Sequence, residues 1–141
     1  MARARRTQRC VGGMNLCVEA AGTIVALALQ SFTLSWDHSV ERIEWSERWT
    51  IRPQGLVLEE AIVRGTGAGM EIPEGAVLKD GAWRYRPSLP ALPELLLSDA
   101  GRGTDWTLCD GEGRCRRLSD LVPAAGEVVR LSPCDRAESQ P

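Results

Sequence analysis

The chain has 141 residues, which suits one domain of ordinary size and suffices to bury a core. Its formal net charge is −2, and four arginines among the first nine residues leave the remainder more acidic still. A mildly acidic domain is a poor phosphate binder, so no nucleic-acid partner is expected. The sequence has one histidine and no Cys-x-x-Cys pair, so it predicts no structural zinc site and indicates no cofactor.

The N-terminus begins like a signal peptide, with a basic stretch before an apolar run. Glu19 interrupts that run, and the uncharged stretch 20–36 is too short and too polar at its end to span a bilayer. We therefore expect a cytoplasmic protein, with a periplasmic one as the alternative. The expected organisation is a disordered basic extension over 1–13, with Met14 as an alternative natural start, a single β domain over 14–134 and a disordered tail over 135–141.

Short segments of alternating or β-branched residues succeed one another along the chain, separated by turn-forming residues. No stretch shows sustained helical periodicity. The predicted strands cover residues 15–20, 23–29, 32–40, 43–51, 56–64, 76–78, 83–85, 94–97, 106–109, 115–118 and 127–131. This pattern predicts an all-β fold, either a single-domain β-sandwich or a partly open β-barrel of short antiparallel strands.

The apolar residues change from even to odd positions between the third and fourth of these segments. Phe32, Leu34 and Trp36 are even-numbered, whereas the apolar residues from Ile43 onward are odd-numbered. A reversal of face requires an extra residue or a bend, so we predict a β-bulge or corner near residues 41–42.

Asp80-Gly81 lies between two short apolar segments, a pairing typical of a type I′ hairpin turn. In that hairpin Leu78 would lie opposite Trp83. The same register would place Ala76 opposite Tyr85.

Cys109 and Cys115 flank a five-residue loop. If the loop closes a hairpin, the two cysteines face each other and could form a disulfide. The alternative is two reduced thiols of a cytosolic protein, and the compartment expected above favours it.

Polar side chains interrupt the apolar faces at two positions, His38 and Glu47. Burial of an unpaired ionisable group costs several kcal/mol, so each should have a partner. One interpretation gathers His38, Glu41 and Glu47 across the bend as a cluster that binds a ligand or metal, or moves protons. The alternative is a structural hydrogen-bond network. Nothing marks Ser39 as a nucleophile, so no catalytic residue is assigned.

Gly67 and Gly69 belong to a glycine-rich run that resembles a phosphate loop only superficially. No helix start follows the run, and the lysine of a P-loop is missing. We interpret it as a loop whose backbone passes close to a neighbouring strand or a ligand.

The sequence contains five tryptophans but one Phe and one Tyr. Indole faces suit sugars and cations, so these side chains could line a ligand site that includes Trp45. The alternating placement of Trp36, Trp45 and Trp49 favours a core role instead.

Four motifs occur in a specific order: His38-Ser-Val-Glu41, Gly67-Ala-Gly69, Leu78-Lys-Asp-Gly81 and Leu92-Pro-Glu-Leu95. In this order they resemble the bacterial family called domain of unknown function 1850, over about residues 16–134. The resemblance implies a link to transport, because members are often encoded beside subunits of tripartite ATP-independent periplasmic (TRAP) transporters of the TAXI type. Some members also carry an N-terminal hydrophobic anchor. It implies no activity.

The resulting expectation is a non-enzymatic accessory protein of a TRAP-type transporter that binds a transporter subunit or a small solute and does not span the membrane. The alternative is a small metal-binding or hydrolytic protein that uses His38, Glu41 and Glu47. The candidate binding residues are His38, Ser39, Glu41, Trp45, Glu47, Gly67 and Gly69.

Overall fold

The computed structural model describes residues 14–38, 43–64, 75–97 and 106–135. Within these ranges the chain forms strands, one short 3-10 turn (Leu118–Asp120) and no α-helix, so the all-β prediction is confirmed. The strands are β1 (Asn15–Ala20), β2 (Thr23–Leu27), β3 (Ser31–His38), β4 (Ile43–Arg52), β5 (Gly55–Arg64), β6 (Val77–Lys79), β7 (Ala82–Tyr85), β8 (Leu95–Leu97), β9 (Thr107–Cys109), β10 (Cys115–Arg117) and β11 (Val129–Cys134).

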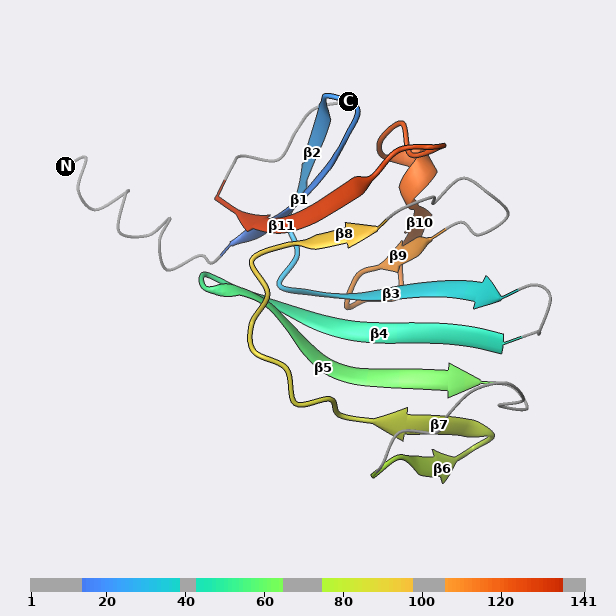
Figure 1. Ribbon diagram of the computed structural model, residues 1–141. Helices are drawn as coiled ribbons and strands as arrows, with labels where there is room; N and C mark the ends of the chain where they lie inside the picture. Colours follow the sequence, from blue (N-terminus) through green and yellow to red (C-terminus); the bar gives the residue numbers. More distant parts are fainter. Residues whose placement is uncertain (1–13, 39–42, 65–74, 98–105, 136–141) are drawn as a thin grey trace.

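The strands form two antiparallel sheets (Figure 1). Sheet A has the order β2-β1-β11-β8, and sheet B has the order β10-β9-β3-β4-β5-β7-β6. The sheets do not close on one another, so the architecture is a β-sandwich rather than a barrel. Sheet B is the larger, and β7 and β6 lie at the end of it that is farthest from sheet A (Figure 1).

The pairing of β3 with β4 accounts for the apolar phase reversal without a bulge or corner, and the bulge or corner predicted near residues 41–42 lies outside the described residues. β3 and β4 form an antiparallel pair, with His38 opposite Ile43 and Trp36 opposite Trp45. The numbers of each pair sum to 81, so even-numbered residues of β3 share a face with odd-numbered residues of β4. The register does shift between Arg48 and Trp49, where β4 meets β5.

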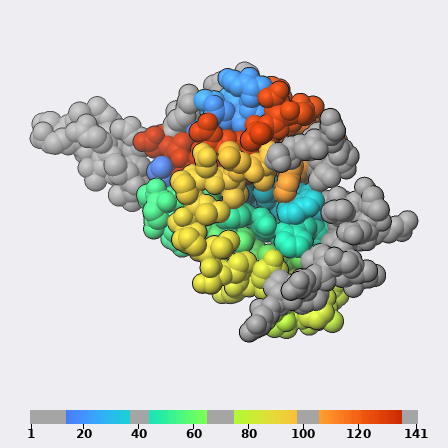
Figure 2. Space-filling view, in the orientation of Figure 1, coloured from blue at the N-terminus to red at the C-terminus, as the bar shows by residue number. Residues whose placement is uncertain are grey.

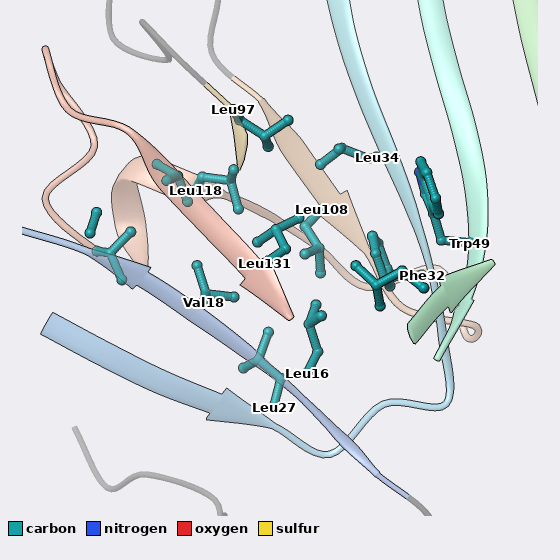
Figure 3. Close-up of a cluster of buried hydrophobic side chains, with 14 of the residues drawn as sticks. Leu16, Val18, Leu27, Phe32, Leu34, Trp49, Leu97, Leu108, Leu118 and Leu131 are labelled. Carbon is teal, nitrogen blue, oxygen red and sulfur yellow. The ribbon is translucent and has the colours of Figure 1, made fainter. Parts of the chain in front are cut away.

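The hydrophobic core lies between sheet A and the nearer part of sheet B (Figure 3). Leu16, Val18 and Leu131 come from sheet A and are fully buried. Phe32 and Trp49, which are directly opposite each other on β3 and β4, close the core from sheet B. The alternating patterns of these strands are therefore explained by one apolar face on each sheet.

The Asp80-Gly81 hairpin is confirmed. Both residues have positive φ angles, 54° and 78°, as a type I′ turn requires. Leu78 lies opposite Trp83, in the predicted register.

The connection from β7 to β8 returns the chain to sheet A. It forms two backbone hydrogen bonds with β5. The Leu56 backbone N–H donates to Leu92 O at 2.7 Å, and the Leu92 N–H donates to Leu56 O at 2.9 Å. This segment lies on the surface between β11 and the strands of sheet B (Figure 2). Gly55 is required here, because a Cβ at its position would lie 2.5 Å from the carbonyl oxygen of Leu92.

Two disulfides join described cysteines. Cys17 on β1 is bonded to Cys134 on β11, which links strands near the two ends of the chain across a separation of 117 residues. Cys109 and Cys115 lie directly opposite each other on β9 and β10 and are also bonded. The expectation of reduced thiols at this hairpin is therefore corrected, because antiparallel pairing brings the two sulfur atoms together.

Asp110 closes the loop between Cys109 and Cys115. Its Oδ1 accepts hydrogen bonds from the backbone N–H groups of Glu112 at 2.8 Å and Arg114 at 2.9 Å. The bond from Arg114 is the main cause that lowers the pKa of the Asp110 carboxyl. The loop is thus held in the shape that sets the cysteines opposite each other.

Candidate functional site

One face of sheet B carries most of the aromatic side chains of the protein. The register aligns Trp36, Trp45, Val63 and Trp83 in one row across β3, β4, β5 and β7. The adjacent row contains Leu34, Glu47, Ala61 and Tyr85. Directly opposed residues of antiparallel strands project on the same side, so the two rows form one surface. We call this surface the aromatic face; its members are Trp36, Trp45, Glu47, Trp49, Trp83 and Tyr85, together with Trp106 against Trp36.

The rings on this face contact one another. The ring centroids of Trp36 and Trp45 are 5.6 Å apart, and those of Trp36 and Trp106 are 4.1 Å apart. Both pairs are tilted, with interplanar angles of 31° and 52°. Tilted pairs at such separations are favourable for aromatic rings, so the three indoles support one another.

Glu47 carries a negative charge on this face. Trp45 Nε1 donates to Glu47 Oε2 at 3.1 Å, and Trp49 Nε1 donates to Glu47 Oε1 at 3.2 Å. The expectation that this carboxylate has a hydrogen-bond partner is therefore confirmed, although the sequence did not identify the indoles as the donors. Their spacing was the available clue, since residues two before and two after Glu47 on a strand share its face.

The exposure of the side chains varies across this face. Leu34, Ala61, Val63 and Trp49 are buried, whereas Trp36, Trp45, Glu47, Trp83 and Tyr85 are only partly buried. The carboxylate therefore lies at the border between the core and solvent. Each of its oxygens keeps acceptor capacity beyond the one indole bond, so it can receive a further donor.

Tyr85 occupies the same row as Glu47, two strands away. Burial is the main cause that raises the pKa of its phenol, and the negative charge of Glu47 raises it further. Both causes favour the neutral hydroxyl. Tyr85 can therefore offer a hydrogen-bond donor and an aromatic ring in the same row as the carboxylate.

The cations of β4, β5 and β7 lie on the opposite face of sheet B. Arg48 Nη2 and Arg84 Nη1 approach Glu60 Oε1 at 3.7 Å and 3.6 Å. Arg64 Nε lies 3.4 Å from Glu44 Oε1. Across β3, β4, β5 and β7, the two rows that contain Trp36 and Glu47 have no positively charged side chain. The row of Glu47 continues through Leu34 and Leu108 to Arg116 on β10, at the other end of the sheet.

The remaining predicted site residues lie mostly outside the described residues. This applies to Ser39, Glu41, Gly67 and Gly69, and to the side chain of His38. The backbone of His38 pairs with Ile43, so the Trp36–Trp45 pair lies between it and the row of Glu47. Ile43, the partner of His38, and Glu47 are four residues apart along β4, which corresponds to about 13 Å.

The described part of the chain contains no group of three or more His, Cys, Asp or Glu residues that could hold a metal ion. It also contains no helix with the length and apolar character needed to cross a bilayer.

Comparison with known protein families matches the central part of the chain. The family described as Domain of unknown function (DUF1850) matches residues 32–118, which is more than half of the sequence. The matched segment contains β3, β4, β5 and β7, which build the aromatic face. No curated protein and no solved structure matches the chain.

Proposed function

Since the chain belongs to the DUF1850 family, we propose that it is a non-enzymatic accessory protein of a TRAP-type (TAXI) transporter and that it binds a small solute on the aromatic face. The transporter half of the proposal rests on the family resemblance, because members are often encoded beside TAXI-type subunits. The solute half rests on one observation: the Glu47 carboxylate is held between Trp45 and Trp49 on a partly exposed surface of aromatic rings.

The chemistry of this surface favours an organic cation, such as an alkylammonium group. Glu47 supplies a negative charge, and on β3, β4, β5 and β7 no cation shares its row or the row of Trp36. Arg116 lies in the row of Glu47 but three strands away, on β10. Indole and phenol faces attract cations through their ring quadrupoles, by about 0.5–2 kcal/mol each according to exposure. An ammonium group could therefore contact the carboxylate while its carbon substituents lie against Trp36, Trp45 or Trp83.

The same geometry supports binding rather than catalysis. Both oxygens of Glu47 accept indole hydrogen bonds, so the carboxylate is fixed in one orientation. A fixed carboxylate suits recognition, whereas a general base must reach and take a substrate proton. The indoles do not transfer protons at ordinary pH, because Nε1–H is a donor only.

The proposal places the domain in the periplasm. The sequence alone had favoured the cytoplasm, with the periplasm as the alternative. Cys17–Cys134 and Cys109–Cys115 are bonded pairs, and structural disulfides persist in oxidising compartments. A transporter accessory protein on that side would meet solute before transport.

Two experiments test the halves separately. For the solute half, tryptophan fluorescence is titrated with choline and with its neutral isostere 3,3-dimethylbutanol. We expect a saturable change with choline and a much weaker one with the alcohol; equal responses would contradict the cation site.

For the transporter half, the tagged protein is purified from cells that express the neighbouring transporter subunits. Recovery of none of them would contradict that half and leave the solute half standing.

A further inference from the structure

A cavity of about 450 Å³ lies at the far end of sheet B, where β5, β7 and β6 meet. It is lined by Glu60, Val77, Lys79, Arg84, Tyr85 and Arg86. Val77 and Arg84 are directly paired, and both alternate with Leu78 and Trp83 along their strands. The cavity therefore opens on the face of sheet B opposite to the aromatic face.

The lining is strongly basic. Lys79, Arg84 and Arg86 contribute three cations, and Glu60 contributes a single carboxylate. Glu60 is already shared, because its Oε1 lies between Arg48 Nη2 at 3.7 Å and Arg84 Nη1 at 3.6 Å. One carboxylate that serves two arginines at these distances leaves the cavity with an excess of positive charge.

Arg84 also has a buried donor that no described group satisfies. Its Nε is shielded from solvent and has no hydrogen-bond partner among the residues that the structure describes. Buried polar groups are almost always paired, and a charged donor without an acceptor is costly. Glu60 approaches Nη1, so it does not serve the edge formed by Nε–H and Nη2–H. Arginine can use that edge to donate two parallel hydrogen bonds to a carboxylate.

We propose that this cavity binds a small organic carboxylate that pairs with the guanidinium of Arg84. Lys79 and Arg86 add positive charge at the rim, and Val77 contacts the carbon skeleton. The volume is within the usual range for small-molecule sites. Glu60 disfavours a dianionic phosphate, because its negative charge lies beside the same guanidinium. This site is independent of the proposed solute site, since its face and its ligand charge are both different.

The test measures binding of acetate, succinate and inorganic phosphate to the full chain by calorimetry at constant ionic strength. We expect saturable binding of a carboxylate and weaker binding of phosphate. Arg84→Lys keeps the charge but removes the planar guanidinium, so it should weaken carboxylate binding about tenfold or more. Arg64→Gln is the matched control, because Arg64 lies on the same face but outside the cavity and pairs with Glu44; it should bind like the wild type.

Two further variants keep the test decisive if Arg84→Lys fails to fold. The double variant Lys79→Gln/Arg86→Gln changes exposed side chains and should also weaken binding. Glu60→Gln removes the competing negative charge and should strengthen it. The proposal is overturned if no carboxylate binds saturably, if phosphate binds as tightly as the carboxylates, or if both basic-residue variants bind like the wild type. Glu47→Gln should leave carboxylate binding unchanged, which separates this result from the fate of the aromatic face.

Discussion

Trp45 and Glu47 lie two residues apart on β4, and the Trp45 indole donates to the Glu47 carboxylate over 3.1 Å. Trp49 holds the other oxygen from the opposite side along the strand. A strand places residues i−2, i and i+2 on one face, so this arrangement follows from spacing alone. It leaves a carboxylate with one orientation at the edge of the core, surrounded by aromatic rings.

The first prediction concerns Tyr85, whose pKa is raised above 10.0 by burial and then by Glu47. A folded-state pKa above the unfolded value means that Tyr85 contributes stability that is complete below about pH 10. That contribution is lost as the pH rises through the folded-state value. Tyr85 is the single tyrosine of the chain, so ultraviolet absorbance of tyrosinate reports its titration directly.

Glu47→Gln should lower the pKa of Tyr85 but leave it above that of the unfolded chain, because burial is the larger cause. Glu44→Gln is the control, since Glu44 lies on the same strand and pairs with Arg64 on the other face. A Tyr85 pKa that Glu47→Gln does not change would show that the two side chains do not interact.

The second prediction concerns the disulfides. In the chain-entropy view a longer closed loop gives more stability, about 4–5 kcal/mol for the Cys17–Cys134 loop and about 2 kcal/mol for Cys109–Cys115. Cys17→Ser/Cys134→Ser should therefore lower the free energy of unfolding by more than Cys109→Ser/Cys115→Ser does. Urea denaturation of the two variants checks the order. The chain has five cysteines and two disulfides use four, so thiol titration of the protein as isolated should find no more than one reactive thiol. Five reactive thiols would refute the pairing.

The third prediction concerns Gly55. Its φ of 145° suits glycine, and an added Cβ would meet the Leu92 carbonyl oxygen at 2.5 Å. Gly55→Ala should cost about 2 kcal/mol or more, because the strained backbone and the displaced β5–Leu92 bridge act together. Gly126→Ala is the matched control, with a φ of 72° but open space around its Cβ, and should cost about 1 kcal/mol. Equal losses in thermal denaturation would mean that the close approach to Leu92 does not matter.

Local patterns in the sequence predicted most of the fold. Alternation located the strands, and Asp80-Gly81 predicted both its hairpin and the Leu78–Trp83 register. The phase reversal near residues 41–42 was ambiguous in the sequence, because it is produced equally by a bulge and by two strands that pair antiparallel. A single sequence does not distinguish these until the strand partner is known.

Features that depend on distant pairing were beyond local patterns. The Cys17–Cys134 disulfide requires β1 to lie beside β11, which no segment of either strand specifies. The site was predicted in part. Glu47 was singled out by its place on an apolar face, but the rows that join it to Tyr85 arise only when β4, β5 and β7 are assembled.

The most direct test of the aromatic face is calorimetric titration of choline into the wild type, Glu47→Gln and Glu44→Gln. Glu47→Gln keeps the shape of the side chain and removes its charge, whereas Glu44→Gln makes the same change on the opposite face of β4. We predict that the wild type and Glu44→Gln bind choline alike and that Glu47→Gln binds it about tenfold more weakly or worse. Equal binding by all three proteins, or no binding by the wild type, would contradict the proposal that Glu47 recognises an organic cation.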